Sequence, residues 1–310
     1  MSTKLRVGWH REHFLSPLLQ FVEKDKGETV ELIECPGGTG EMQVKLKNGE
    51  IDLCIALTDA LIAGLANGQT SYKIVGRYIA SPLRWAIITG KDSQYNSVND
   101  LKGTTFGISR LGRQWLPSYG LSLIIAARMV RRGAAKVQGY AIIFPWIVPS
   151  LYLSVNGQFK PLRDSVNSGE TSVFLWEWFT TKPYVDSGEV RFIGSVYTPW
   201  PCWHIAASPS VPSSTIKTFL ASLQPYVQHF NSPEARASED IEFVHNFFGH
   251  KKEDVAEWLQ SVKWEQRLAE VKKDVVKETL AVLSKAGVIP EDAENMKLQD
   301  IVNTEVATIV

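Results

Sequence analysis

The sequence predicts an α/β protein with two lobes, each a mostly parallel sheet flanked by helices. Strand-like apolar runs alternate with helical patterns over residues 5–80, and this β-α-β-α order is typical of a mostly parallel sheet. A second alternation begins near Leu101, and proline-marked breaks at residues 81–84 and 199–203 separate the two. The 310 residues are enough for two lobes with cores of their own.

The first alternation has four expected strands. Residues 51–57 are nearly all apolar, as in a strand buried on both faces. Gly37–Gly40 lies between a strand and a helical pattern, so it predicts a strand–turn–helix connection. The expected strands cover residues 5–9, 30–34, 51–57 and 72–80. Three helices are expected: one that begins near Ser16, one that runs from the glycine turn to Asn48–Gly49, and one over residues 60–66.

The second alternation is less regular, and a helical tail follows it. Pro199-Trp200-Pro201 is expected to end the alternation, and residues after 207 are expected to be helical. The expected strands cover residues 84–89, 104–108, 171–176, 190–193 and 203–207, with a long helix over 116–129 and a helical turn over 177–182.

Two short segments resemble each other. Lys47-Asn48-Gly49-Glu50 precedes the expected strand at 51–57, and Asn167-Ser168-Gly169-Glu170 precedes the one at 171–176. This similarity predicts two related lobes, although strings this short also match by chance. Ligands of open α/β sheets bind outside the carboxyl ends of the strands, so we expect one cleft lined by these ends.

Composition excludes several classes of function. Lys+Arg and Asp+Glu both number 33, and zero net charge argues against electrostatic binding to nucleic acid or an anionic membrane. The three cysteines are scattered without a CxxC motif, which favours free thiols over disulfides or a zinc site. The N-terminus has no secretory pattern, and no apolar run is long enough to span a bilayer. We expect a cytoplasmic protein, a monomer or weak dimer, whose partner is a small molecule.

Four segments of the chain resemble those of a known family. The segments VGWHREHFLSPL, NGEIDLCIALTDALIAG, DLKGTTFGISRLGRQ and FLWEWFTTKP occur in this order. Over roughly residues 4–285 they resemble the type II periplasmic-binding-protein fold, and within it the sulfonate- and thiamine-pyrimidine-binding group with its fungal cytosolic relatives. The resemblance implies a discontinuous lobe one (residues 1–84 and 204–310), a lobe two (residues 85–203) and a two-strand hinge that closes on a small ligand.

Some relatives implied by this resemblance are thiamine pyrimidine precursor synthases, which use pyridoxal phosphate, iron and a histidine of their own chain. In this sequence that histidine position falls at Ala60, and only Cys202 lies where those enzymes have a cysteine cluster. We therefore expect non-catalytic binding, with no cofactor and no metal, and keep the synthase-like enzyme as the alternative. Residues 128–154 depart from the family, and we expect this segment to pack poorly.

Trp176-Glu177-Trp178 is the sharpest candidate for ligand contact. Two indoles beside a carboxylate suit a flat nitrogenous ring, which they stack on while the carboxylate accepts its N–H groups. Neighbouring strand residues point to opposite faces, so the alternative is that one indole belongs to the core.

The other candidates also follow expected strands. We expect an anionic group to bind at the turn of Gly38, Thr39 and Gly40, with Thr39 as helix cap, and at a second turn. Thr58 and Asp59 are either ligand contacts or only the cap of the next helix. Trp9 and His10 end the first strand, and Arg84 either lines the cleft or packs. The second turn contributes Ser109, Arg110, Gly112 and Arg113.

Overall fold

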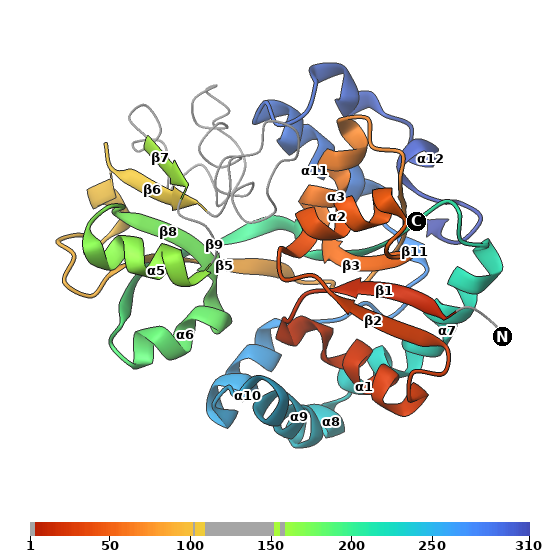
Figure 1. Ribbon diagram of the computed structural model, residues 1–310, viewed down its shortest axis with the longest axis horizontal. Helices are drawn as coiled ribbons and strands as arrows, with labels where there is room; N and C mark the ends of the chain where they lie inside the picture. The colour runs from red at the N-terminus through yellow and green to blue at the C-terminus, as the bar shows by residue number, and fades with distance from the viewer. Residues whose placement is uncertain (1–3, 102, 109–151, 156–158) are drawn as a thin grey trace. The chain divides into compact units, whose positions relative to one another are not determined.

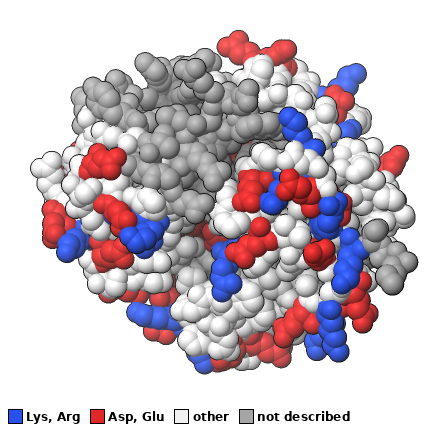
Figure 2. Space-filling model, in the orientation of Figure 1, with Lys and Arg blue, Asp and Glu red and all other residues white. Residues whose placement is uncertain are grey.

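The computed structural model describes residues 4–101, 103–108, 152–155 and 159–310, and it divides into two compact units (Figure 1). Unit 1 comprises Met1–Pro82, Trp200–Glu278 and Asn295–Val310, and unit 2 comprises Leu83–Pro199 and Thr279–Glu294. Of the helices in the described ranges, none has the length and apolar character to cross a bilayer. Figure 2 shows basic and acidic side chains interspersed, in keeping with their equal numbers, 33 and 33.

Unit 1 is built on a five-stranded sheet of order β2-β1-β3-β10-β4. β1 pairs in parallel with β2 and β3, and β10 runs antiparallel to its neighbours β3 and β4. Four of the five strands therefore run in one direction and β10 is reversed, which is the mostly parallel sheet that the sequence predicted. Every residue of β3 is buried, as its apolar run predicted. The strands are β1 (Leu5–Trp9), β2 (Val30–Glu34), β3 (Leu53–Leu57), β4 (Lys73–Arg77) and β10 (Trp203–Ala207).

Helices cover both faces of this sheet. The chain steps outward from β1 to β2 and back to β3, and right-handed crossovers then place α1 and α2 on opposite faces (Figure 1). α1 packs beside α7, and α2 packs beside α3. The helices before the tail are α1 (Ser16–Asp25), which follows the short helix η1 (His13–Leu15), α2 (Gly38–Asn48) and α3 (Thr58–Ala66). Those of the tail are α7 (Ser213–Phe230), α8 (Pro233–Ala237), α9 (Glu239–Phe248), α10 (Lys252–Ser261), α11 (Lys273–Lys285), η4 (Glu291–Asn295) and α12 (Leu298–Ile301).

Unit 2 repeats this sheet order with β7-β6-β8-β5-β9. β6 pairs in parallel with β7 and β8, and β5 is antiparallel to β8, so β5 holds the place that β10 holds in unit 1. The strands are β5 (Pro82–Gly90), β6 (Thr105–Ile108), β7 (Tyr152–Val155), β8 (Val173–Glu177) and β9 (Val190–Pro201). The described helices of this chain segment are η2 (Val98–Leu101), α5 (Phe159–Ser168) and α6 (Trp178–Asp186). Unit 2 also includes the second half of α11 and most of η4 from the tail.

The two short sequence repeats occupy equivalent positions in the units. Gly49 follows α2 and precedes β3, and Gly169 follows α5 and precedes β8. Their φ angles are +69° and +79°, in the left-handed region that glycine adopts without strain. The weak sequence repeat is therefore a repeated helix–turn–strand unit.

Two expectations about element bounds are wrong. β9 continues through Pro199-Trp200-Pro201, where we expected a break. β9 lies at the edge of its sheet, where a proline without an N–H group costs no ladder hydrogen bond. The tail also contains a two-stranded parallel sheet of β11 (Glu270–Val271) and β12 (Thr308–Ile309), so it is not all helix. The expected helix at 116–129 and the unusual segment at 128–154, apart from β7, lie outside the described residues.

Candidate functional site

Within each unit, candidate residues gather where the parallel strands end. In unit 1, β3 ends at Leu57, and the antiparallel β10 begins opposite it at Trp203. In unit 2, β8 ends at Glu177, and Trp85 of the antiparallel β5 lies opposite. Ligands of α/β sheets bind beyond such carboxyl ends, so each unit presents one candidate edge.

Thr39 is not the helix cap that we expected at the glycine turn. α2 begins at Gly38, and its N-cap is Gly37, two residues before the expected cap. Gly38 has a φ of +65°, in the left-handed region that glycine adopts without strain. Thr39 is buried, and its Oγ1 accepts a hydrogen bond from the backbone N–H of Leu57 at 3.1 Å, so it ties α2 to the end of β3.

The N-terminus of α2 already has a carboxylate. The backbone N–H of Gly37 donates to Oε2 of Glu41 at 2.6 Å. A carboxylate at this end is favoured by the helix dipole, and an anionic ligand there would meet its negative charge. The contact weakens the expectation that Gly38, Thr39 and Gly40 hold an anionic group.

Thr58 joins the start of α3 to the start of β10. Leu57 is the N-cap, so Thr58 and Asp59 are the first helical residues rather than the cap, and both are buried. Oγ1 of Thr58 donates to the carbonyl of Pro201 at 2.5 Å and lies 2.7 Å from Nδ1 of His204. A hydroxyl has one hydrogen, so His204 must donate from Nδ1. Burial lowers the pKa of His204 to about 3, which keeps this imidazole neutral.

His10 follows β1 and is partly buried, whereas Trp9 is buried at the strand's end. Nδ1 of His10 donates to the carbonyl of Cys35 at 3.0 Å, which leaves Nε2 as an acceptor. Nε2 lies 3.9 Å from Oε1 of Glu12, and Nδ1 of His13 lies 3.7 Å from Oε2 of Glu12. Burial lowers the pKa of both histidines, so neither contact is an ion pair at neutral pH.

Trp176 lies in the core of unit 2, the alternative that the sequence left open for one of the indoles. It is 6% exposed and stacks on Phe159 with ring centroids 4.8 Å apart. Glu177 is buried and caps α6, since its Oε2 accepts from the backbone N–H of Thr180 at 2.6 Å. Burial raises the pKa of Glu177 to about 7, against hydrogen bonds that favour its charged form.

Trp178 is partly exposed, but both faces of its ring are occupied. Phe192 stacks on it with ring centroids 3.9 Å apart, and the guanidinium carbon of Arg84 lies 3.6 Å from the ring centre. Two groups this close to the ring centre cannot share a face. In this arrangement Trp178 supports the arginine rather than offering a face to a flat ligand.

Arg84 is partly exposed at the start of β5. Its Nε donates to Oγ of Ser195 at 3.2 Å, and Tyr197, 46% exposed, lies 5.9 Å from its guanidinium carbon. Ser195, Phe192 and Tyr197 all come from β9. Arg84 is thus held by a ring and a hydroxyl, and it belongs to the candidate edge of unit 2.

Sequence reasoning missed five residues at these edges: Glu12, Phe192, Ser195, Tyr197 and His204. The polar His204 within an apolar strand was a usable signal, and so was Glu12 between two histidines. The β9 residues carried none, because their role depends on pairing with residues far away in the chain. Ser109, Arg110, Gly112 and Arg113 lie outside the described residues.

The structure resembles several solved proteins over nearly its whole length. The CA3427 gene product of Candida albicans, described as having the generic periplasmic binding protein fold, matches with a TM-score of 0.81 and 29% identity, over 97% of this chain and 96% of that one. The alkanesulfonate-binding protein SsuA of Xanthomonas axonopodis pv. citri, bound to MOPS, matches with a TM-score of 0.70 and 13% identity, over 99% and 98% of the two chains.

Other comparisons agree on the fold. The nitrate-binding protein NrtA of Synechocystis PCC 6803 matches with a TM-score of 0.67 and 13% identity, over 98% of this chain and 87% of that one. Residues 85–196 match the family described as Ca3427-like periplasmic binding proteins. No protein curated for its function matches the sequence significantly. The chain has a two-lobed, periplasmic-binding-protein-like fold.

Proposed function

We propose that this chain, with its periplasmic-binding-protein-like fold, is a non-catalytic protein that binds a small planar nitrogenous or anionic metabolite. The observation that carries this proposal is the fold match over nearly the whole chain to proteins named for the small ions they bind, alkanesulfonate and nitrate. The carboxyl edge of unit 2 supports it, because Arg84, Trp178 and Tyr197 there are partly exposed.

We further propose that the ligand is thiamine-pyrimidine-like or sulfonate-like, that it binds in the interlobe cleft with hinge closure, and that the protein acts in the cytoplasm. All three follow from the family resemblance, which includes fungal cytosolic relatives. Binding is favoured over the synthase alternative at two positions. Ala60 is a buried alanine within α3, without a group that can react, and Cys202 is a buried thiol.

Native mass spectrometry of the purified protein tests the proposal, followed by thermal shift with thiamine, its pyrimidine, pyridoxal phosphate and small sulfonates. A ligand that binds only the folded chain stabilises it by about 2.7 kcal/mol at a hundred times its Kd. A co-purified small molecule or a saturable shift supports binding. Absence of both, across the whole panel, would contradict the proposal.

A paired substitution separates ligand contact from loss of folding. Trp178→Leu removes the ring beneath Arg84, and Tyr184→Leu removes a second ring of the same helix that also lies beneath an arginine, Arg163. We expect Trp178→Leu to weaken binding of the identified ligand and Tyr184→Leu to leave it unchanged. Equal effects of the two variants would argue against a site at the carboxyl edge of unit 2.

A further inference from the structure

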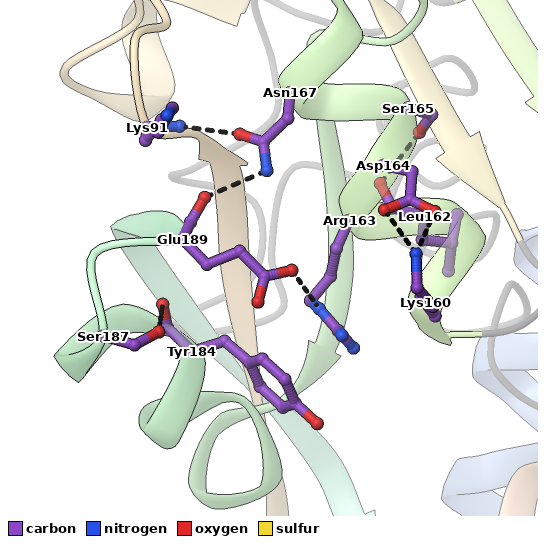
Figure 3. Close-up of polar contacts among 10 residues, drawn as sticks. All are labelled: Lys91, Lys160, Leu162, Arg163, Asp164, Ser165, Asn167, Tyr184, Ser187 and Glu189. Carbon is purple, nitrogen blue, oxygen red and sulfur yellow. Dashed lines mark hydrogen bonds and ion pairs between the residues drawn. The ribbon is translucent and has the colours of Figure 1, made fainter.

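Unit 2 contains two arginines that are stacked on aromatic rings but differ in their partners. Arg163 lies over Tyr184, 3.7 Å from the ring centre, and its Nε donates to Oε1 of Glu189 at 2.8 Å (Figure 3). Arg84 lies over Trp178 at 3.6 Å, and its Nε donates to Oγ of Ser195 at 3.2 Å. The first arginine has a carboxylate to balance its charge, and the second has a neutral hydroxyl.

No described carboxylate contacts Arg84 directly, but its charge acts at longer range on Glu177, where it partly offsets the rise in pKa that burial causes. Across the described residues, Arg84 forms no ion pair, and its terminal nitrogens Nη1 and Nη2 donate no hydrogen bond. A partly buried guanidinium whose terminal nitrogens have no direct partner is unfavourable, because these N–H groups lose hydrogen bonds to water. An anion at Nη1 and Nη2 would remove that cost.

We propose that Arg84 binds the acidic group of the ligand, a carboxylate, sulfonate or phosphate, through Nη1 and Nη2. The inference rests on the proposed function and specifies its ligand class. The two terminal nitrogens form a planar fork that matches two oxygens of such a group. Trp178 and Ser195 hold the fork in place, so little side-chain freedom is lost on binding.

The contacts of the glycine turn support the choice of Arg84. That turn was the other described candidate for an anionic group, and there Glu41 already accepts the N–H of Gly37 at 2.6 Å. Among the described residues, two rings lie near the Arg84 guanidinium, and Tyr197, 46% exposed, is more exposed than Trp178. Solvent, and hence a ligand, reaches the side of Arg84 on which Tyr197 lies.

Matched probes test the inference on the intact protein. Calorimetry would measure binding of methanesulfonate, MOPS, acetate and inorganic phosphate, with dimethyl sulfone as a neutral probe of nearly the same shape as methanesulfonate. We expect at least one anion to bind and dimethyl sulfone to bind far more weakly. The anions differ in their acidic group, so their ranking identifies which class the fork prefers.

Substitutions assign the effect to Arg84. We expect Arg84→Gln to weaken the best anion about 10- to 100-fold, the range of hydrogen bonds to a charged group, and Arg163→Gln to change it less than about twofold. Arg84→Lys keeps the charge without the fork and should lie between. Ser195→Ala keeps the arginine but frees Nε, and should weaken binding about two- to fivefold by loosening the fork.

Three results would overturn the inference: unchanged anion binding by a folded Arg84→Gln variant, equal losses in Arg84→Gln and Arg163→Gln, or no binding of any anion by the wild-type protein. The proposed function fails separately. If a co-purified or neutral ligand binds wild type and Arg84→Gln equally, the chain is still a solute-binding protein and only the role of Arg84 falls. If no ligand of any class binds, both fall.

Discussion

The two strand-to-helix junctions, β3–α3 in unit 1 and β8–α6 in unit 2, have the same backbone conformation but carry different side chains. Their N-cap residues have nearly the same conformation, with φ −62° and ψ 131° at Leu57 and φ −59° and ψ 134° at Glu177. Each lies opposite a buried tryptophan of the antiparallel strand, Trp203 and Trp85 respectively. The repeat therefore extends to the geometry of single residues.

The side chains at these two junctions make different contacts. In unit 1 the cap is apolar, and the Thr58 hydroxyl links α3 to the carbonyl of Pro201 and to His204. In unit 2 the cap is Glu177, and the next residue, Trp178, supports Arg84. Sheet order and cap geometry determine where the side chains lie, and the residue types then decide whether a junction links helix to strand, as in unit 1, or supports an arginine, as in unit 2.

Thr58→Val, at the junction of unit 1, should change the free energy of unfolding most. Valine has nearly the shape of threonine, but it leaves the carbonyl of Pro201 and Nδ1–H of His204 without their buried partner. Each lost buried hydrogen bond costs about 1–3 kcal/mol, so we expect the two together to lower the free energy of unfolding by about 2–6 kcal/mol. Denaturant titration measures it.

Thr58→Ser is the matched control, because it keeps the hydroxyl and removes one methyl group. It should cost about 1 kcal/mol, near the value of one buried methylene. If serine and valine are equally destabilising, the hydroxyl is not what links α3 to β10, and the two junctions differ less than their contacts indicate.

Local patterns predicted the elements, and pairing over long distances decided the site. Residues 203–207 were predicted as a strand and form β10, because the apolar run there is continuous. Ser195 lies 111 residues from Arg84, and His204 lies 146 residues from Thr58, so no local pattern could join them. The fold class followed from alternation along the chain, whereas the partners of each side chain depend on which strands become neighbours.

Glu177 makes stability depend on pH, with a smaller effect. Burial raises its pKa from 4.5 to about 7, so between these values the folded chain binds more protons than the unfolded chain. The free energy of unfolding should therefore fall as pH rises from about 4.5 through about 7, by about 1–3 kcal/mol from this residue. Thermal unfolding measured across this range tests the slope.

The control for this slope is Glu177→Gln, which still accepts from the N–H of Thr180 but does not titrate. Asp240 contributes a slope of the same sign, because burial raises its pKa to about 7 as well. The difference between wild type and Glu177→Gln isolates the contribution of the junction in unit 2. Parallel pH profiles for the two proteins would show that Glu177 is not held in this environment.

The smallest effect tests the repeat itself. Gly49 and Gly169 have φ angles of +69° and +79°, and an added Cβ would meet no atom within 4 Å at either position. Alanine should therefore cost only the backbone strain, about 1 kcal/mol in each unit. Gly40→Ala is the opposite control: Gly40 lies inside α2 with open space around it, so alanine should stabilise by about 0.5–1 kcal/mol. Unequal losses at Gly49 and Gly169, measured by denaturant titration, would mean that the two turns are alike in conformation but not in energy.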